Sequence, residues 1–405
     1  MADHQVILEA EEKHSLYQAE FQKVFRLKKE QQPFAFKRHL MGNVMGSHRD
    51  HGGGQSLLIS LPLSCTLFFY PHSNDVIDIY NLEQREFYSY CYDATRPRMP
   101  QNMEHWSYVV WQVLGFWQNL DRPILGMHLM VVSDVPLSDS FSMRMAMRLE
   151  ILRLLHVYVL KDKMWLHLNR RDEQLSLIDL LQRSLREDPF EEYSMFELYG
   201  MILARNMGQL IFSNSRTLEP RAMQLKLKQH QFWLVYMSNM HRVLKEMRQA
   251  GDAQSEVALL SLQALGLQIN NFNAMSLSEL KQYEHQIKRE HFLSAKYLVE
   301  ENIRVALMAQ ALDEGDEFEV VRLMKESADG MISYYFCNNS IISDIYKNIY
   351  NHKGVVAVRL SSLQEGLFMV LVNQAISFDL SRGFNVVKRD LLHDYDLPML
   401  VNRLI

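Results

Sequence analysis

The segment Asn43-Val44-Met45-Gly46-Ser47-His48-Arg49-Asp50-His51-Gly52-Gly53-Gly54 is the most informative one for the fold of this chain. It holds two histidines and an aspartate ahead of three consecutive glycines. Imidazole and carboxylate groups are common zinc ligands, and His39 lies just upstream, so a metal site is one interpretation. The spacing of these residues matches no metal-binding motif, however, and we predict no metal site here.

Strand and helix patterns are mixed on both sides of this segment. Runs of β-branched and aromatic residues predict strands at 33–38, 57–63, 65–70, 76–80 and 125–133. Apolar residues at helical spacing predict helices at 6–30, 106–119, 142–160, 172–186, 240–265, 276–290, 294–312 and 317–330. A β-hairpin is predicted near 355–360 and 367–372. Because strands and helices do not alternate strictly, the predicted fold class is α+β.

The chain of 405 residues is long enough for two domains, each with its own core. An acidic, proline-containing run at residues 186–192 is the predicted boundary between them. We therefore expect an N-terminal domain of residues 1–190 and a C-terminal domain of residues 191–405.

Composition and charge exclude several classes of function. Hydrophobic residues at 48% and charged residues at 22% are typical of a soluble globular protein. The net charge of −5 provides no broad basic surface, so we expect no nucleic-acid partner. Three widely spaced cysteines predict reduced thiols rather than a disulfide framework. No signal peptide or membrane-spanning run is evident, so we expect a cytoplasmic protein with no membrane partner.

The opening segment resembles the sugar-binding signature of galactokinases, which reads G-R-V-N-L-I-G-E-H-T-D-Y-N-G-G. The two align without gaps, and the matching residues are Asn43, Gly46, His48, Asp50, Gly53 and Gly54. Met41 stands where the family has its arginine, and Ser47 where it has a glutamate. Further segments resemble the family in the same order, at residues 21–25, 132–137, 294–305, 311–316 and 323–327. The chain is thereby identified as a degenerate member of the galactokinases, which are GHMP small-molecule kinases.

This resemblance implies a two-domain GHMP-kinase-like fold with the ligand cleft between the domains. It also implies galactose as the ancestral substrate, with Ser47, His48, Asp50 and Gly53 as the sugar-binding residues. His48 and Asp50 match family residues that hydrogen-bond sugar hydroxyls. Ser47 replaces a glutamate and leaves one weaker contact.

The nucleotide site implied by the resemblance has lost most of its glycines. The family's phosphate loop continues G-x-G-L-S-S-S-A, whereas residues 138–145 here contain no glycine. The nucleotide contacts fall on Ser140, Ser142 and Arg144; Arg144 either pairs with phosphate or is solvated on its helix. The third motif, M-T-G-G-G-F-G-G, aligns with residues 360–367, where one glycine of five survives. Such loops need glycine, because side chains disfavour positive φ angles and block close ligand approach.

The general base is ambiguous. In the family, the aspartate of G-I-M-D-Q takes a proton from the sugar's anomeric hydroxyl, helped by the arginine of the first motif. Counting forward from Gln182-Arg183 places this aspartate at Glu197, and counting back from Met207-Gly208-Gln209 places it at Met201. Glu197 is thus either a surrogate base, about one helical turn away, or a helix-surface residue. The forward count also places the family's magnesium-binding glutamate at Leu185, which cannot bind a metal.

These substitutions predict a galactokinase-like protein that is catalytically impaired or inactive and retains a sugar site. One alternative is an active ATP-dependent sugar kinase in which Glu197 or Asp50 is the base and Arg144 stabilises phosphate. The other is a regulatory scaffold that binds neither ligand and acts through a protein partner. ATP and Mg²⁺ are cofactors only if the protein is active, and the sequence leaves open whether it is an enzyme.

Overall fold

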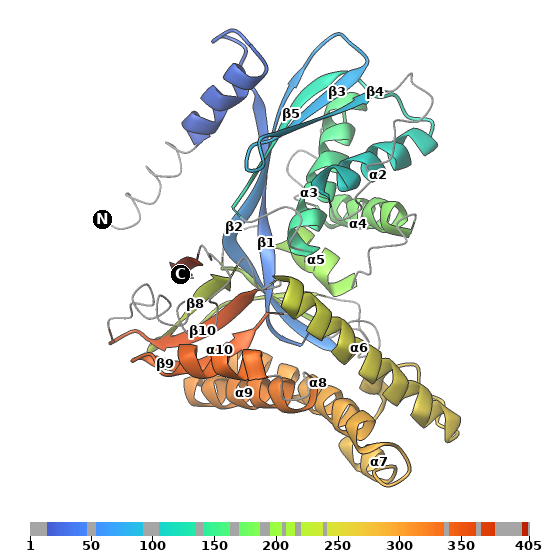
Figure 1. Cartoon of the computed structure of the whole chain (residues 1–405), viewed down its shortest axis with the longest axis vertical. Coiled ribbons are helices and arrows are strands. Elements are labelled where there is room, and N and C mark those ends of the chain that lie inside the picture. The colour runs from blue at the N-terminus through green and yellow to red at the C-terminus, as the bar shows by residue number, and fades with distance from the viewer. Residues whose placement is uncertain are drawn as a thin grey trace. The chain divides into compact units, whose positions relative to one another are not determined.

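The computed structural model contains two compact units, each built from several segments of the chain. The first unit takes residues 1–40, 63–138 and 143–192, and the second takes residues 41–62, 139–142 and 193–405. The structure describes residues 14–46, 54–91, 105–134, 141–162, 170–186, 195–204, 208–214, 220–237, 241–335, 340–361, 366–376 and 399–403 (Figure 1). The long strands β1 (Phe34–Gly46) and β2 (Gln55–Pro71) contribute residues to both units.

The first unit combines a mixed sheet with helices. Besides its parts of β1 and β2, its described elements are a helix over residues 14–24, β3 (Val76–Asn81), β4 (Glu86–Cys91), α2 (Trp106–Asn119), β5 (Met127–Ser133), α3 (Phe141–Leu154), a π-helical turn (Leu155–Val159) and α4 (Arg171–Arg186). The strands pair in the order β4-β3-β5-β2, with β3 and β5 parallel and the other pairs antiparallel. The helix over 14–24 joins this sheet through Phe21, which shares a core with Phe68 and Met130.

The second unit contains a separate four-stranded sheet. Its further elements are α5 (Met195–Leu203), β6 (Leu210–Asn214), β7 (Arg221–Met223), β8 (His230–Met237), α6 (His241–Ala264), a 3₁₀ turn (Phe272–Ala274), α7 (Leu277–Lys281), α8 (Arg289–Glu314), α9 (Glu317–Gly330), a π-helical turn (Met331–Tyr335), α10 (Ser340–Tyr350), β9 (Val355–Leu360), β10 (Leu367–Asn373) and β11 (Met399–Arg403). The sheet runs β11-β8-β10-β9 and is antiparallel throughout, while β6 pairs with β2 and β7. Helices α8 and α9 lie side by side (Figure 1), and α9 and α10 contact β9.

The junction between α8 and α9 is set by two consecutive residues. Gly315 ends α8 with a left-handed backbone (φ 76°), which glycine adopts without steric cost. Asp316 then caps α9, because its side chain accepts a hydrogen bond from the backbone N–H of Glu319 at 3.1 Å. This short link turns the chain back and packs the two long helices against each other.

The sequence predicted most of the major helices. Those at 106–119, 172–186, 240–265 and 317–330 and the hairpin of β9 and β10 are confirmed, as is the α+β class. The helix predicted at 6–30 is present over residues 14–24, and residues 6–13 lie outside the described part. None of the described helices combines the length and apolar character needed to cross a bilayer.

Four predicted elements need correction. The strands predicted at 57–63 and 65–70 form the single strand β2, in which the N–H of Ser64 donates to the Asp134 carboxylate at 2.7 Å. The helix predicted at 142–160 changes from α to π at Leu155. The helix predicted at 276–290 is wrong, because α7 ends at Lys281. Backbone hydrogen bonds between residues three apart, as in 3₁₀ turns, follow it before α8 begins.

Two glycines provide a matched test of this packing. A Cβ atom on Gly330 would lie 2.8 Å from Cδ2 of Tyr297, whereas one on Gly115 in α2 would meet no atom within 4 Å. We expect Gly330→Ala to destabilise the protein by about 1–3 kcal/mol through overpacking. Gly115→Ala should stabilise it by about 0.5–1 kcal/mol, because alanine loses less backbone entropy in a helix. Urea unfolding followed by circular dichroism measures both, and effects of the same sign would contradict this packing.

Candidate functional site

The end of β1 leads directly into the signature loop. Residues Met41–Gly46 are all fully buried or nearly so, and the side-chain amide of Asn43 donates to the carbonyl of Gly46 at 2.8 Å. Gly46 adopts a left-handed backbone (φ 76°), and a Cβ atom there would lie 2.2 Å from the carbonyl oxygen of Gln55. The glycine therefore allows both ends of the loop over residues 47–54 to come together.

A buried carboxylate fixes the first end of this loop. The N–H of Gly46 donates to Oε1 of Glu301 at 3.2 Å. Arg359 donates to the same oxygen at 3.0 Å, and Arg304 donates to Oε2 at 3.0 Å. The hydroxyl of Ser327 completes the set at 2.6 Å. Since Glu301 is 1% exposed and Arg359 0%, the carboxylate charge is balanced by guanidinium groups away from water.

The residue after Glu301 fixes the other end of the loop. Oδ1 of Asn302 accepts a hydrogen bond from the N–H of Gln55 at 3.2 Å. A Cβ atom on Gly54 would lie 1.7 Å from that oxygen, so only glycine fits beside Asn302. Consecutive residues of α8 thus hold both ends of the signature loop.

The third motif, at residues 360–367, contacts the same stretch of β1 near its start. The hydroxyl of Ser361 donates to Oδ1 of Asn43 at 2.9 Å and accepts from the N–H of Asn43 at 3.2 Å. The N–H of Ser361 also bonds the carbonyl of Leu367 at 2.7 Å, and Gly366 has a positive φ of 84°. Ser361, the last described residue before segment 362–365, therefore lies beside Asn43 and pairs with Leu367 on the far side of that segment.

The end of the phosphate-loop segment also contacts the Met41–Gly46 stretch of β1. Ser142, at the start of α3, is fully buried, and its hydroxyl accepts a hydrogen bond from the N–H of Met41 at 2.8 Å. Arg144 is half-buried on the same helix. The three motif segments 47–53, 135–140 and 362–365 are thus each flanked by a residue that contacts or belongs to Met41–Gly46, which defines the candidate site.

Helix α5, where the two counts place the general base, packs on the same stretch. A Cβ atom on Gly200 would lie 2.4 Å from Leu58 and 3.5 Å from Cε of Met41. The side chain of Met41 is fully buried, and Met201 and Leu185 are each only 1% exposed. The position of the family's arginine is therefore part of an apolar core.

Several predicted site residues lie outside the described part of the chain: Ser47, His48, Asp50, Gly53 and Ser140. Glu197 lies on α5, but its side chain is outside the description. Their roles stay predictions. Sequence reasoning missed the roles of Glu301 and Arg304, although both occupy matched positions of the family helix at residues 294–305.

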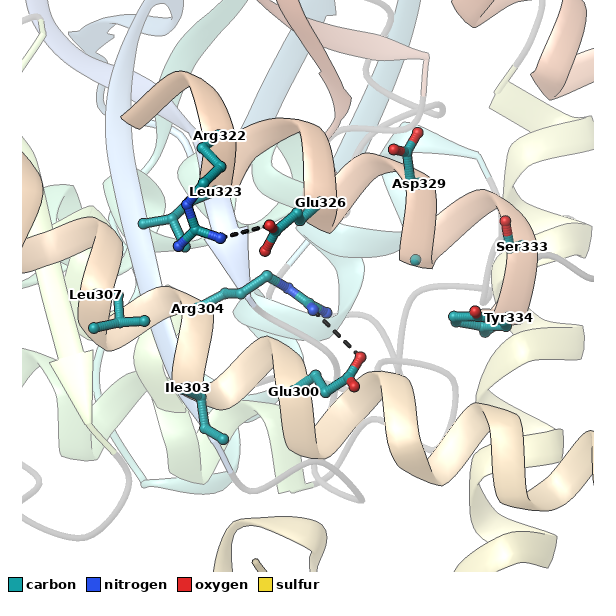
Figure 2. A pocket seen from close by; sticks show the side chains of 11 residues that line it. Glu300, Ile303, Arg304, Leu307, Arg322, Leu323, Glu326, Asp329, Ser333 and Tyr334 are labelled. Atoms are coloured by element: carbon teal, nitrogen blue, oxygen red, sulfur yellow. Dashed lines mark hydrogen bonds and ion pairs between the residues drawn. The ribbon is translucent and has the colours of Figure 1, made fainter. Parts of the chain in front are cut away.

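A groove between α8 and α9 adjoins the Glu301 network. It has a volume of about 470 Å³ and is lined by charged side chains from both helices. Figure 2 shows Arg304 directed at Glu300 and Arg322 directed at Glu326, pairs that are 3.5 Å and 2.5 Å apart. Burial lowers the pKa of Arg304, but the nearby Glu301 carboxylate and Tyr297 outweigh it and raise the pKa overall. The groove's arginines are therefore already engaged by acidic neighbours.

Comparisons with known proteins identify the fold. No protein-family model matches the sequence. The chain is 22% identical over 325 residues to a galactokinase of Lactobacillus helveticus, covering 78% of this chain and 80% of the relative. The galactose-bound crystal structure of Lactococcus lactis galactokinase superposes with a TM-score of 0.78 at 16% identity, over 96% of this chain and 97% of that one. A mevalonate kinase structure superposes with a TM-score of 0.56 at 12% identity, over 92% and 99%.

The chain therefore has the fold of the GHMP small-molecule kinases, as predicted. Its sequence match extends over most of the length of a galactokinase, which confirms the predicted resemblance. The protein is galactokinase-like.

The Glu301 network generates a direct test. Glu301→Gln removes the carboxylate charge that buried Arg359 contacts and leaves Arg304 with only its longer contact to Glu300, so we expect a loss of about 3–5 kcal/mol in stability. Glu300→Gln is the matched control, because Glu300 is the neighbouring residue, is 26% exposed and contacts Arg304 at 3.5 Å. Glu300→Gln should lower the stability of the protein by less than about 1 kcal/mol. Equal losses in urea unfolding would show that Glu301 has no special role.

Proposed function

We propose that the protein is a sugar-binding relative of the galactokinases in which phosphoryl transfer is weakened or lost. The observation that supports this most is the complete burial of the Met41 side chain beside Gly200 of α5. Met41 occupies the position of the arginine that assists the catalytic base in the family. A thioether in an apolar core cannot stabilise developing negative charge as a guanidinium group does.

The sugar site is the part that we expect to remain. Ser47, His48, Asp50 and Gly53 follow a strand end that Glu301 holds, so the loop leaves the fold from a fixed point. His48 and Asp50 supply the hydrogen-bonding groups of the signature, and the lactococcal relative is described with galactose bound. We therefore propose galactose or a closely related hexose as the ligand.

Nucleotide binding is expected to be weak. Of the residues proposed to contact the nucleotide, Ser140, Ser142 and Arg144, Ser142 already accepts the N–H of Met41 and is fully buried. Its hydroxyl retains one proton to donate, but no exposed surface. The loop also lacks the glycines that allow backbone N–H groups to approach phosphate.

An active kinase with rebuilt residues is the second candidate. It is favoured by the packing of α5 against Met41, because a glutamate such as Glu197 then belongs to a helix adjoining the candidate site. In this candidate Glu197 is the base, Arg144 pairs with the phosphate, and Mg²⁺ enters with ATP.

Calorimetric titration with galactose and with MgATP separates these candidates. We expect heat from galactose alone that Asp50→Asn abolishes, since the aspartate accepts hydroxyl protons, and little heat from MgATP. Asp75→Asn, at another carboxylate of the chain outside the signature, is the control. Tight, sugar-dependent MgATP binding would support the rebuilt kinase. If folded protein gives no heat with either ligand, only the hypothesis of a regulatory scaffold that binds neither ligand would remain.

Restoring the family's arginine at position 41 should not restore kinase activity. Met41→Arg places a charge in a fully buried site among apolar neighbours, so we expect it to destabilise the protein by about 3 kcal/mol or more. Met41→Leu keeps the volume and should cost less than about 1.5 kcal/mol. The comparison uses urea unfolding. A stable Met41→Arg variant that gains kinase activity would show that this position still faces a working active site.

A further inference from the structure

Three potential metal ligands converge on the sheet of the first unit. His72 follows β2, Asp78 lies in β3 and His128 lies in β5. The parallel register of β3 and β5 sets Asp78 directly beside His128. One ligand atom of each residue lies within 4.8 Å of the other two, and Oδ2 of Asp78 is 3.6 Å from Nδ1 of His128.

The two imidazoles have unused polar atoms. Nε2 of His72 and Nδ1 of His128 are buried and have no hydrogen-bond partner among the described residues. The ring centroids are 4.3 Å apart. Burial is the main cause that lowers the pKa of both side chains, and Asp78 opposes it only in part. Each imidazole thus has a buried ring nitrogen that no described hydrogen bond occupies.

We propose that His72, Asp78 and His128 bind a divalent transition-metal ion of the Zn²⁺ type, with water in the remaining position. Two imidazoles and one carboxylate suit Zn²⁺, Co²⁺ or Ni²⁺ better than Ca²⁺ or Mg²⁺. Ligand atoms around tetrahedral zinc lie about 3.4 Å apart, as its bond lengths require. The pair Asp78–His128, at 3.6 Å, is already close to this separation, and all three residues are partly exposed, so water can reach the ion.

Neighbouring residues orient two of the ligands. The hydroxyl of Ser89 donates to Oδ1 of Asp78 at 2.7 Å, which leaves Oδ2 for the ion. The ring of Phe25 stacks on His128 with centroids 4.5 Å apart and fixes the plane of the imidazole. Such outer contacts commonly tune metal affinity.

The turn after β2 positions the third ligand. The N–H of His72 donates to the carbonyl of Gly126 at 3.0 Å, and a Cβ atom on Gly126 would overlap the carbonyl oxygen of Asn74 at 1.5 Å. Glycine at 126 is thus what allows this turn to lie against β5. The N–H of Asn74 donates to Nδ1 of His72 at 3.2 Å. An ion bound at Nε2 would place the ring proton on Nδ1, and this long hydrogen bond would then be lost.

Zinc titration of the full-length, chelator-treated protein tests the site. We expect a single equivalent of Zn²⁺ to bind by calorimetry, and Co²⁺ to give the visible absorption of a four-coordinate centre. His72→Ala and His128→Ala should each weaken binding about 100-fold or more, and Ser89→Ala about tenfold. Zn²⁺ should also raise the melting temperature of the wild type but not of these ligand variants.

His105→Ala is the matched control. His105 is also partly exposed and faces a carboxylate, with Nε2 2.8 Å from Glu86, but it is not part of the cluster. Binding should be unchanged in this variant. Absence of Zn²⁺ binding at micromolar concentrations, or equal affinity of the wild type and His128→Ala, would overturn the proposal. If an alanine variant fails to fold, Asp78→Asn, which keeps the side-chain shape, decides instead.

Discussion

The buried carboxylate of Glu301 is the interaction on which the described part of the candidate site depends. A carboxylate that is removed from water is stable only when its charge and its lone pairs are satisfied. Arg304, Arg359 and Ser327 do so from three different elements, and the N–H of Gly46 adds the end of β1. Any shift of these elements would expose or orphan a charge. The point from which the signature loop leaves the fold is therefore held rigidly.

This arrangement separates the scaffold of the site from its chemistry. Asn43, Gly46 and Gly54, which match the galactokinase signature, are used to join the loop ends to one another and to neighbouring segments. Met41, which departs from the signature, is packed in the apolar core. An apolar side chain there avoids the desolvation cost of an arginine, so the fold tolerates the loss of the charge. A stable galactokinase-like fold is thus compatible with weakened catalysis.

The sequence predicted those features whose signals are local. The apolar spacing of α2 and the Glu314-Gly315-Asp316 junction give strong helix boundaries. The three-residue strand β7 and strand β8 were not predicted, because their pairing with distant strands decides them. The role of Glu301 was also hidden, since its contact with Gly46 spans 255 residues of sequence. The cluster of His72, Asp78 and His128 has no sequence motif, because the turn after β2 and the two strands β3 and β5 bring it together.

The central claim, sugar binding without efficient phosphoryl transfer, is tested most directly by a single-turnover experiment. Excess protein is incubated with galactose and MgATP, and phosphorus NMR follows conversion to a sugar phosphate and ADP. If phosphoryl transfer is weakened or lost, the wild type should form no more sugar phosphate than an Asp50→Asn variant does. Stoichiometric conversion by the wild type, abolished in Asp50→Asn and in Glu197→Gln, would contradict the claim and establish an active kinase with rebuilt residues.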